Sequence, residues 1–278
     1  MAMQLMNRAT WKLGFALVSL LSFGACADVD AEGADDQLGV DDADNFVGDE
    51  AEGSNDPLAQ LFPAQNGTPG ADQGKGNGND VVTIGDSWMD NTLGTNRAIS
   101  GALRRKGYRY QNYAVQGTEL LQTTLFGPSI PIQYSNAIRQ HRGLKTVIMT
   151  GGGNDILISG PSDCRRGGPQ CTAKLGRISQ GLKDLWEIMA RDGVQDVVYV
   201  GYAAEAGGNT APATFKTPST NGVGEKCAAM TSLRCHYIET TDTVRRRFVI
   251  DGIHPTQAAN NDIADLVIRL LNEQGIRS

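Results

Sequence analysis

The chain has 278 residues, with 25 Lys and Arg against 31 Asp and Glu, and a formal net charge of −6. This length allows one large domain or two small ones. Nucleic-acid binders usually present a basic face, so the charge argues against that class and no nucleic-acid partner is expected. The charge is uneven, because residues 28–79 hold 13 acids and one base, whereas residues 80–278 hold 18 acids and 22 bases. The acidity therefore belongs to a tail, and the domain that follows it is slightly basic.

Residues 1–27 are typical of an export signal. Two basic residues precede an apolar run of 13 residues, 13–25, which is too short to span a bilayer comfortably. Two processing routes stay open. Cleavage after Ala27 would follow an Ala-x-Ala site, whereas Phe-Gly-Ala-Cys at 23–26 resembles a bacterial lipobox in which Cys26 is lipidated. We therefore expect an exported protein, either secreted or anchored to the membrane of the bacterial cell envelope through Cys26.

Residues 28–79 are rich in Gly, Asp, Ala and Asn and have no hydrophobic period. Such a segment cannot bury enough apolar surface to offset the entropy of ordering it, so we expect a disordered acidic linker. Like charges would extend this linker. It would serve as a tether or spacer between the cleavage site or membrane anchor and the domain.

Residues 80–278 alternate short apolar runs with longer amphipathic ones, which predicts one α/β domain. Strands are predicted at 80–84, 108–115, 145–150 and 196–200, with a fifth at 235–240 or 248–250. Helices are predicted at 96–106, 131–141 and 173–191, and after Thr256, which can cap the last one. The alternation indicates a three-layer α/β/α fold around a parallel five-stranded sheet.

The four cysteines of this domain fall in two close pairs, Cys164 with Cys171 and Cys227 with Cys235. In an oxidising compartment, two local disulfides are the simplest of three connectivities. Zinc is the rival, but metal sites usually use tighter cysteine spacing, and no pair of histidines lies beside either set. We therefore expect disulfides and no metal.

Ligands bind outside the carboxyl ends of the strands in parallel sheets, and informative residues follow three predicted strands. Gly-Asp-Ser at 85–87 comes directly after the first strand, although it is by itself a common turn sequence. Gly-Gly-Gly-Asn-Asp at 151–155 follows the third strand and lacks the Lys and Ser or Thr of a phosphate-binding loop. It presents Asn154, whose amide is a good donor to a developing oxyanion. Gly117 follows the second strand and is by itself only a turn glycine.

An acid and a histidine stand close together before the last helix, as Asp251 and His254. This spacing can fold the carboxylate onto one ring nitrogen and leave the other nitrogen free. The other two histidines of the domain have no acid at a useful short spacing. His141 ends a predicted helix, and His236 stands beside a cysteine, so His254 is the candidate for proton transfer.

Together these segments resemble the SGNH hydrolase family, also called the GDSL esterases and lipases. The matching blocks are Gly-Asp-Ser at 85–87, the glycine at 117, Gly-x-Asn-Asp at 152–155 and Asp-x-x-His-Pro at 251–255. The resemblance spans nearly all of residues 80–278, and Trp88 departs from the small or aliphatic residue usual after the serine. It implies the flavodoxin-like sheet of that family, an ester substrate and catalysis without a cofactor.

The resemblance also implies a role for each matching residue. Ser87 would attack an ester carbonyl, His254 would take the serine proton, and Asp251 would orient the imidazole. The backbone N–H groups of Ser87 and Gly117 and the side chain of Asn154 would bind the oxyanion. Two other functions stay open: an acyltransferase that moves an acetyl group onto a sugar, and a surface-binding lipoprotein without catalysis.

The two cysteine-bearing insertions, 158–172 and 203–236, both follow strands and are expected to overhang the site as stiff walls. They offer little aliphatic surface, which favours short acyl groups on carbohydrate or similarly polar substrates. The expected partner is a small-molecule, carbohydrate or lipid ester. Asp86 is expected to shape the serine turn, and Asp155 to brace the Asn154 loop. The domain is expected to be a monomer.

Overall fold

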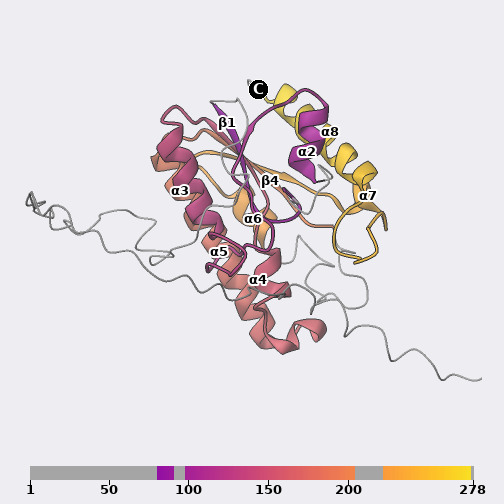
Figure 1. The fold of residues 1–278 in the computed structure, drawn as a ribbon. Helices are drawn as coiled ribbons and strands as arrows, with labels where there is room; N and C mark the ends of the chain where they lie inside the picture. The colour runs from indigo at the N-terminus through magenta and orange to yellow at the C-terminus, as the bar shows by residue number, and fades with distance from the viewer. Residues whose placement is uncertain (1–79, 91–97, 204–221, 277–278) are drawn as a thin grey trace, which may run out of the picture. The chain divides into compact units, whose positions relative to one another are not determined.

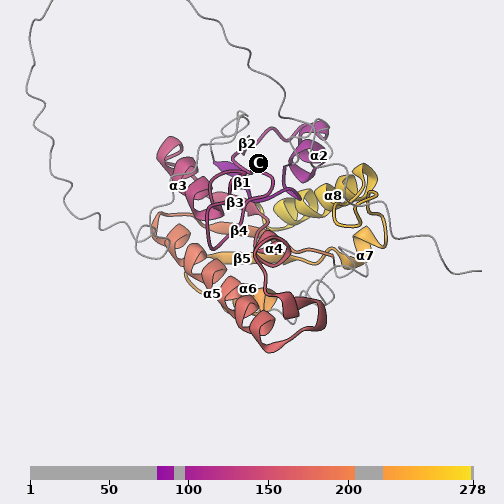
Figure 2. The same cartoon turned by 60° about the horizontal axis from the view of Figure 1, so that its bottom comes forward.

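The structure, a computed structural model, describes residues 80–90, 98–203 and 222–276. These residues contain one five-stranded sheet whose strands all run parallel (Figure 1). The strand order is β2-β1-β3-β4-β5, as labelled in Figure 2. The strands are β1 (Val81–Ile84), β2 (Gln111–Asn112), β3 (Thr146–Met149), β4 (Asp196–Val200) and β5 (Arg234–Ile238). The predicted signal peptide 1–27, with Cys26, and the predicted linker 28–79 lie outside the described residues and stay predictions.

The three central strands are buried along their whole length. They consist of Val-Val-Thr-Ile in β1, Thr-Val-Ile-Met in β3 and Asp-Val-Val-Tyr-Val in β4. Near-continuous apolar and β-branched runs of this kind are typical of parallel sheets covered on both faces. The register aligns Val81 with Thr146 and Thr146 with Asp196. The three central strands therefore start level with one another, and their carboxyl ends lie together on the opposite side of the sheet.

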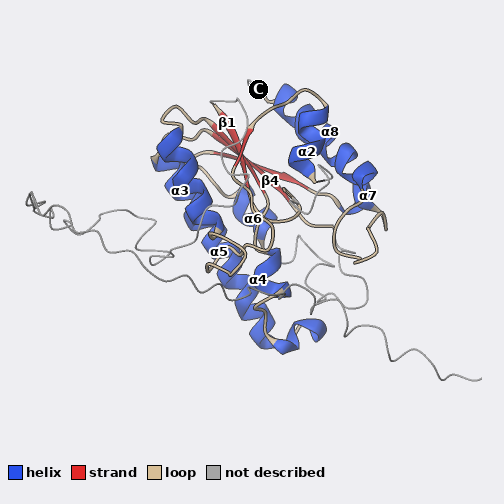
Figure 3. Cartoon of the chain, viewed as in Figure 1, coloured by secondary structure: helices blue, strands red, loops and turns tan. Residues whose placement is uncertain are grey.

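Helices cover both faces of this sheet (Figures 2 and 3). The main ones are α2 (Ile99–Arg105), α3 (Ile130–Gln140), α5 (Pro169–Arg191) and α8 (Gln257–Glu273). Because successive side chains of a strand point to opposite faces, each strand contributes to two cores. Val82 packs with Trp186 of α5 in one core, and Val81 packs with Ile263 of α8 in the other. The predicted three-layer α/β/α fold is confirmed.

The structure decides between the two predicted positions of the fifth strand, and it shortens the second strand. The fifth strand is the first of the two alternatives, since β5 begins at Arg234. The second strand was predicted over 108–115, but the structure has only Gln111–Asn112 in regular pairing at the edge of the sheet. Beyond it, the amides of Tyr113 and Val115 still donate to the carbonyls of β1 and Gly85, at 2.7 and 3.0 Å. The segment is therefore extended but irregular.

Several short helices were not predicted from the sequence. They are α4 (Gly153–Leu157), the 3₁₀ helix η1 (Ser162–Arg166), α6 (Val223–Ala228) and α7 (Thr241–Val244). Of these, α4 matters most, because the segment expected to present Asn154 from a loop becomes helical after Gly152, whose φ is 93°. The helix predicted from residue 173 begins earlier, at Pro169, since proline suits the first turn of a helix. None of the helices in the described ranges is long and apolar enough to cross a membrane.

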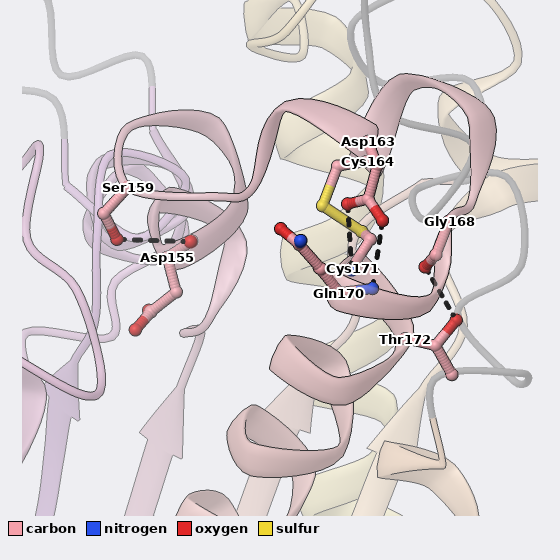
Figure 4. The surroundings of a disulfide bond; sticks show 8 residues. All are labelled: Asp155, Ser159, Asp163, Cys164, Gly168, Gln170, Cys171 and Thr172. Carbon is pink, nitrogen blue, oxygen red and sulfur yellow. Dashed lines mark hydrogen bonds between the residues drawn. A yellow bond between two sulfur atoms is a disulfide. The ribbon is translucent and has the colours of Figure 1, made fainter.

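Both local disulfides are present. The bond between Cys164 and Cys171 joins η1 to the first turn of α5 (Figure 4). Asp163 strengthens this junction by accepting hydrogen bonds from the amides of Gln170 and Cys171, at 2.9 and 3.0 Å. The start of α5 lies on the side where the strands end, because α5 runs back toward the start of β4. This disulfide therefore stiffens the edge expected to hold the site.

The second disulfide corrects one expectation. The bond between Cys227 and Cys235 joins α6 to β5. Cys235 lies in the first half of β5, aligned with Val197 of β4, and so lies toward the edge where the strands begin. Both disulfides were predicted to lie in insertions beside the active site. That prediction is wrong for the bond between Cys227 and Cys235, because the fifth strand begins inside the segment 203–236 that was expected to be an insertion.

Candidate active site

Ser87 lies on a tight turn directly after β1. Gly85 begins this turn with a φ of 139°, and a Cβ there would lie 2.3 Å from the hydroxyl oxygen of Thr150, so only glycine fits. The carboxylate of Asp86 is buried and accepts hydrogen bonds from the Trp88 amide at 3.1 Å and the Thr150 hydroxyl at 3.0 Å. Asp86 therefore shapes the serine turn, as expected from the sequence.

Asp251 and His254 close a turn of their own before α8. One carboxylate oxygen, Oδ1 of Asp251, accepts from the amides of Ile253 and His254, at 2.7 and 2.9 Å. The other, Oδ2, lies 2.6 Å from Nδ1 of His254. Thr256 then caps α8, with its side chain accepting from the amide of Ala259 at 3.3 Å. The local sequence thus holds one ring nitrogen and leaves the other free.

The free nitrogen of His254 meets Ser87. Its Nε2 lies 2.7 Å from Oγ of Ser87, although the two residues are 167 positions apart. The fold therefore assembles a continuous Ser87–His254–Asp251 chain of hydrogen bonds at the carboxyl edge of the sheet. Among the described residues, no group of three or more His, Cys, Asp or Glu side chains is placed to hold a metal ion.

The carboxylates of Asp86 and Asp251 have opposite pKa shifts. Full burial raises the pKa of Asp86, despite the hydrogen bonds that it accepts from Tyr202, Trp88 and Thr150. Partial burial also acts to raise the pKa of Asp251. Hydrogen bonds from the His254 ring and from the amides of His254 and Ile253 outweigh it, so the pKa of Asp251 lies below its usual value. Asp251 is therefore the group suited to stay charged beside the histidine.

The predicted oxyanion donors lie on neighbouring segments. Asn154 is buried in the first turn of α4, and its amide nitrogen donates to the carbonyl of Thr118 at 2.9 Å. An amide nitrogen has two N–H groups, so one is left for a ligand. Gly117 has a φ of 74°, and a Cβ there would lie 2.7 Å from the ring of Phe126. The single hydroxyl proton of Thr118 is shared between the carbonyl of Val115, at 2.8 Å, and the carbonyl of Gly85, at 3.2 Å, next to the serine turn.

One buried residue that joins these segments was missed from the sequence. The side chain of Gln133, fully buried on α3, accepts from the Gly85 amide at 2.7 Å and donates to the Gly85 carbonyl at 3.0 Å. It also donates to the Thr118 hydroxyl at 3.1 Å. The only signal available from the sequence was a polar residue within an apolar helix face. Gln133 ties the serine turn to the segment that carries Gly117.

The other two histidines lie away from this site. His141 ends α3, and its Nε2 lies 2.9 Å from the hydroxyl of Tyr113. The Nε2 of His236 lies 2.9 Å from Oδ1 of Asp196, at the starting edge of the sheet. The partners of these two rings are a tyrosine and an aspartate, and neither contact involves a serine.

Asp155 was predicted to brace the segment that carries Asn154, and its hydrogen bonds do connect that segment to a neighbouring one. Its carboxylate accepts from the amides of Leu120 and Leu121, at 2.7 and 2.9 Å, and so holds the segment after Gly117 against α4. Burial raises the pKa of Asp155 to about 6, against the effect of these two hydrogen bonds, and the nearby charge of Glu119 adds to the rise.

This raised pKa has a measurable consequence for stability. The folded chain keeps the Asp155 proton up to about pH 6, whereas the unfolded chain releases it near its ordinary pKa of 3.8, so stability is lost as pH rises through that window. Relative to the Asp155→Asn variant, the wild-type chain should lose roughly 2–3 kcal/mol between these pH values. Urea unfolding of both proteins from about pH 4 to 7 measures this difference. Because Asn also changes the hydrogen bonding, the readout is the slope and not the offset; parallel profiles would contradict the prediction.

Comparison with known proteins places the fold. No protein-family model and no curated protein sequence matches this chain. Similar solved structures include Est24, a carbohydrate acetylesterase from Sinorhizobium meliloti, with 18% identity and a TM-score of 0.51 over 69% of this chain and 100% of that one. An inhibitor-bound aryl esterase from M. smegmatis has 14% identity and a TM-score of 0.50, over 70% of this chain and 99% of that one. At such identities the likeness is one of fold, and the chain has the parallel α/β/α fold of these esterases.

Proposed function

We propose that this chain is a serine esterase in which Ser87 is the nucleophile, His254 the general base and Asp251 the orienting acid. One observation carries the proposal. Both ring nitrogens of His254 form hydrogen bonds. Nε2 lies 2.7 Å from Oγ of Ser87, and Nδ1 lies 2.6 Å from Oδ2 of Asp251. A nucleophile within hydrogen-bond reach of a base that is itself oriented by a third group is the arrangement that acyl transfer requires.

The proposed reaction uses the residues of this chain and water. Oγ of Ser87 forms a bond to the ester carbonyl carbon while its proton passes to Nε2 of His254. As the tetrahedral intermediate collapses, the carbon–alkoxide bond breaks and His254 returns that proton to the leaving alcohol. Water, deprotonated by His254, then attacks the acyl-enzyme. As the bond between the acyl carbon and Oγ breaks, His254 returns that proton to Oγ of Ser87 and the acid is released. The Asp251 carboxylate stabilises the imidazolium in both halves.

The developing oxyanion needs donors placed beforehand. We assign this role to the amide of Asn154 and to the backbone N–H groups of Ser87 and Gly117. The hydrogen bonds from Gln133 to Gly85 and Thr118, and from Asn154 to the Thr118 carbonyl, support the assignment, because together they connect the three segments.

Labelling with a fluorophosphonate tests the nucleophile directly. Oγ of Ser87 should displace fluoride and form a stable phosphonyl adduct, located by peptide mass spectrometry. The Ser87→Ala variant should not label. Ser232→Ala is a matched control, since Ser232 is exposed and bonds to Glu187 away from the site. Labelling at another serine, or none in the wild-type chain, would refute the proposal.

We further propose short acyl groups, on carbohydrate or a similarly polar alcohol. The polar character of residues 203–236 supports this, as does the likeness to a carbohydrate acetylesterase. With p-nitrophenyl esters of increasing length, kcat/KM should be highest for acetate to butyrate and fall beyond about eight carbons, because few apolar residues are available to form an acyl pocket. A rise in kcat/KM beyond that length would contradict the assignment.

Export is proposed from the N-terminal pattern and supported by two disulfides, which persist in oxidising compartments. The mass of the mature N-terminal peptide decides between the two routes. A diacylglyceryl group on Cys26 would show a membrane-anchored lipoprotein, and a free Asp28 would show cleavage after Ala27.

A further inference from the structure

Tyr202 follows β4, and its phenol lies between the serine turn and α4, the short helix that carries Asn154. Tyr202 is 8% exposed, and its hydroxyl donates to Oδ2 of the buried Asp86. The same hydroxyl accepts from the amide of Gly153, at 3.2 Å. Gly153 is the first residue of α4 and precedes Asn154. One oxygen atom thus bonds to the residue before the proposed nucleophile and to the residue before the proposed oxyanion donor.

The ring of Tyr202 is held as firmly as its hydroxyl. It packs edge-on against Trp88, with ring centroids 5.1 Å apart and planes at 80°. A Cβ at Gly153 would lie 2.8 Å from Cζ of the phenol, so the absence of a side chain at Gly153 is what lets the ring lie against α4. Tyr202 therefore fills the space between the two segments.

Asp86 links this tyrosine back to the strand ends. Its amide donates to the Thr150 hydroxyl at 3.2 Å, and that hydroxyl donates to Asp86 Oδ1 at 3.0 Å. The ends of β1 and β3 and the residues after β4 thus meet around a single buried carboxylate. Because a buried carboxylate without partners is strongly unfavourable, Asp86 and Tyr202 hold each other in place.

We propose that Tyr202 is a positioning residue, which sets the distance and angle between Ser87 and the Asn154 amide through its bridging hydroxyl. This rests on the proposed function, because it assigns the effect to the nucleophile and the oxyanion donor. Tyr202 need not touch the substrate. Misplacement of a reacting group by about 1 Å can lower turnover roughly 100-fold, so a bridge of this kind has a large effect on rate.

The Tyr202→Phe variant tests the bridge, because it removes only the hydroxyl. We expect kcat to fall roughly 10- to 100-fold with KM nearly unchanged, since the interaction that suffers forms in the transition state. The control is Tyr134→Phe, which also removes a buried hydroxyl, bonded to Asp192 at 2.8 Å at the end of α5. It should lower the melting temperature by a similar amount and leave kcat unchanged.

A double-mutant cycle with Asn154→Ala separates positioning from a general structural role. If Tyr202 acts through Asn154, then adding Tyr202→Phe to Asn154→Ala should lower kcat by less than about threefold. Multiplicative losses, or a Tyr202→Phe variant with wild-type kcat, would overturn the inference.

Two measurements keep the test decisive. Should Tyr202→Phe fail to fold, Gly153→Ala displaces the phenol from the other side and should show the same fall in kcat and the same dependence on Asn154. Fluorophosphonate labelling of Ser87 reports the proposed function separately. Labelled Ser87 with an unaffected Tyr202→Phe rejects only the positioning role, whereas absence of labelling rejects the proposed function itself.

Discussion

Replacing Ser87 by alanine should lower kcat for a p-nitrophenyl acetate substrate by roughly 10⁴- to 10⁶-fold, with the fold unchanged. Oγ of Ser87 lies 2.7 Å from Nε2 of His254, so its loss removes the hydroxyl that this base is proposed to deprotonate. The oxyanion donors would remain and account for the residual rate. Steady-state kinetics measures the loss.

Two controls make this result interpretable. Circular dichroism and thermal unfolding of Ser87→Ala should match the wild-type chain, because Ser87 is only partly buried and the turn before it is held by the hydrogen bonds of the Gly85 and Asp86 amides. The exposed-serine variant Ser232→Ala should keep full activity. Substantial activity in a well-folded Ser87→Ala protein would show that another group is the nucleophile.

Replacing Asp251 by asparagine should lower kcat by roughly 10⁴-fold, more than the loss of a hydrogen bond alone would produce. Oδ1 of Asp251 accepts from two backbone amides, at 2.7 and 2.9 Å. The single oxygen of asparagine should keep that place and turn its NH₂ group toward Nδ1 of His254. The ring would then carry its proton on Nε2 and could not accept the proton of Ser87.

The matched control for this variant is Asp242→Asn. Asp242 lies on α7, is largely exposed and pairs with Arg245 at 3.6 Å, so its charge is lost without any change at His254. It should keep wild-type kcat. Near-wild-type kcat for Asp251→Asn would show that the acid does not orient the histidine, even if Ser87 proves to be the nucleophile.

The strands and long helices could be predicted because their signals are local. β1, β3 and β4 are continuous apolar runs, and α5 has an apolar face that repeats at helical spacing. Edge and loop elements were predicted less well. β2 keeps only two regular residues because it pairs with one neighbour, and α4 forms where a left-handed Gly152 redirects the chain.

The histidine turn was also predictable, since Asp251 and His254 close it within three residues and need no distant partner for that. Gln133 and Tyr202 were not predictable in this way. Gln133 is 48 positions from Gly85, and Tyr202 is 116 positions from Asp86, so the contacts that define them exist only once α3 and β4 have packed. The position of the second disulfide was misjudged for a similar reason, because it depends on where β5 begins.

The sequence by itself determined the alternation of strands and helices, the paired cysteines and the polar residues that follow the strand ends, because each is encoded within a few residues. The tertiary structure decided which of those residues meet. Parallel strands in one register bring Ser87 and Asn154 to the same end of the sheet, and the turn before α8 places His254 beside Ser87. Buried side chains from other elements hold these segments there. Apolar patterns within the chain show which residues are buried, but they do not specify which distant residue each side chain will contact.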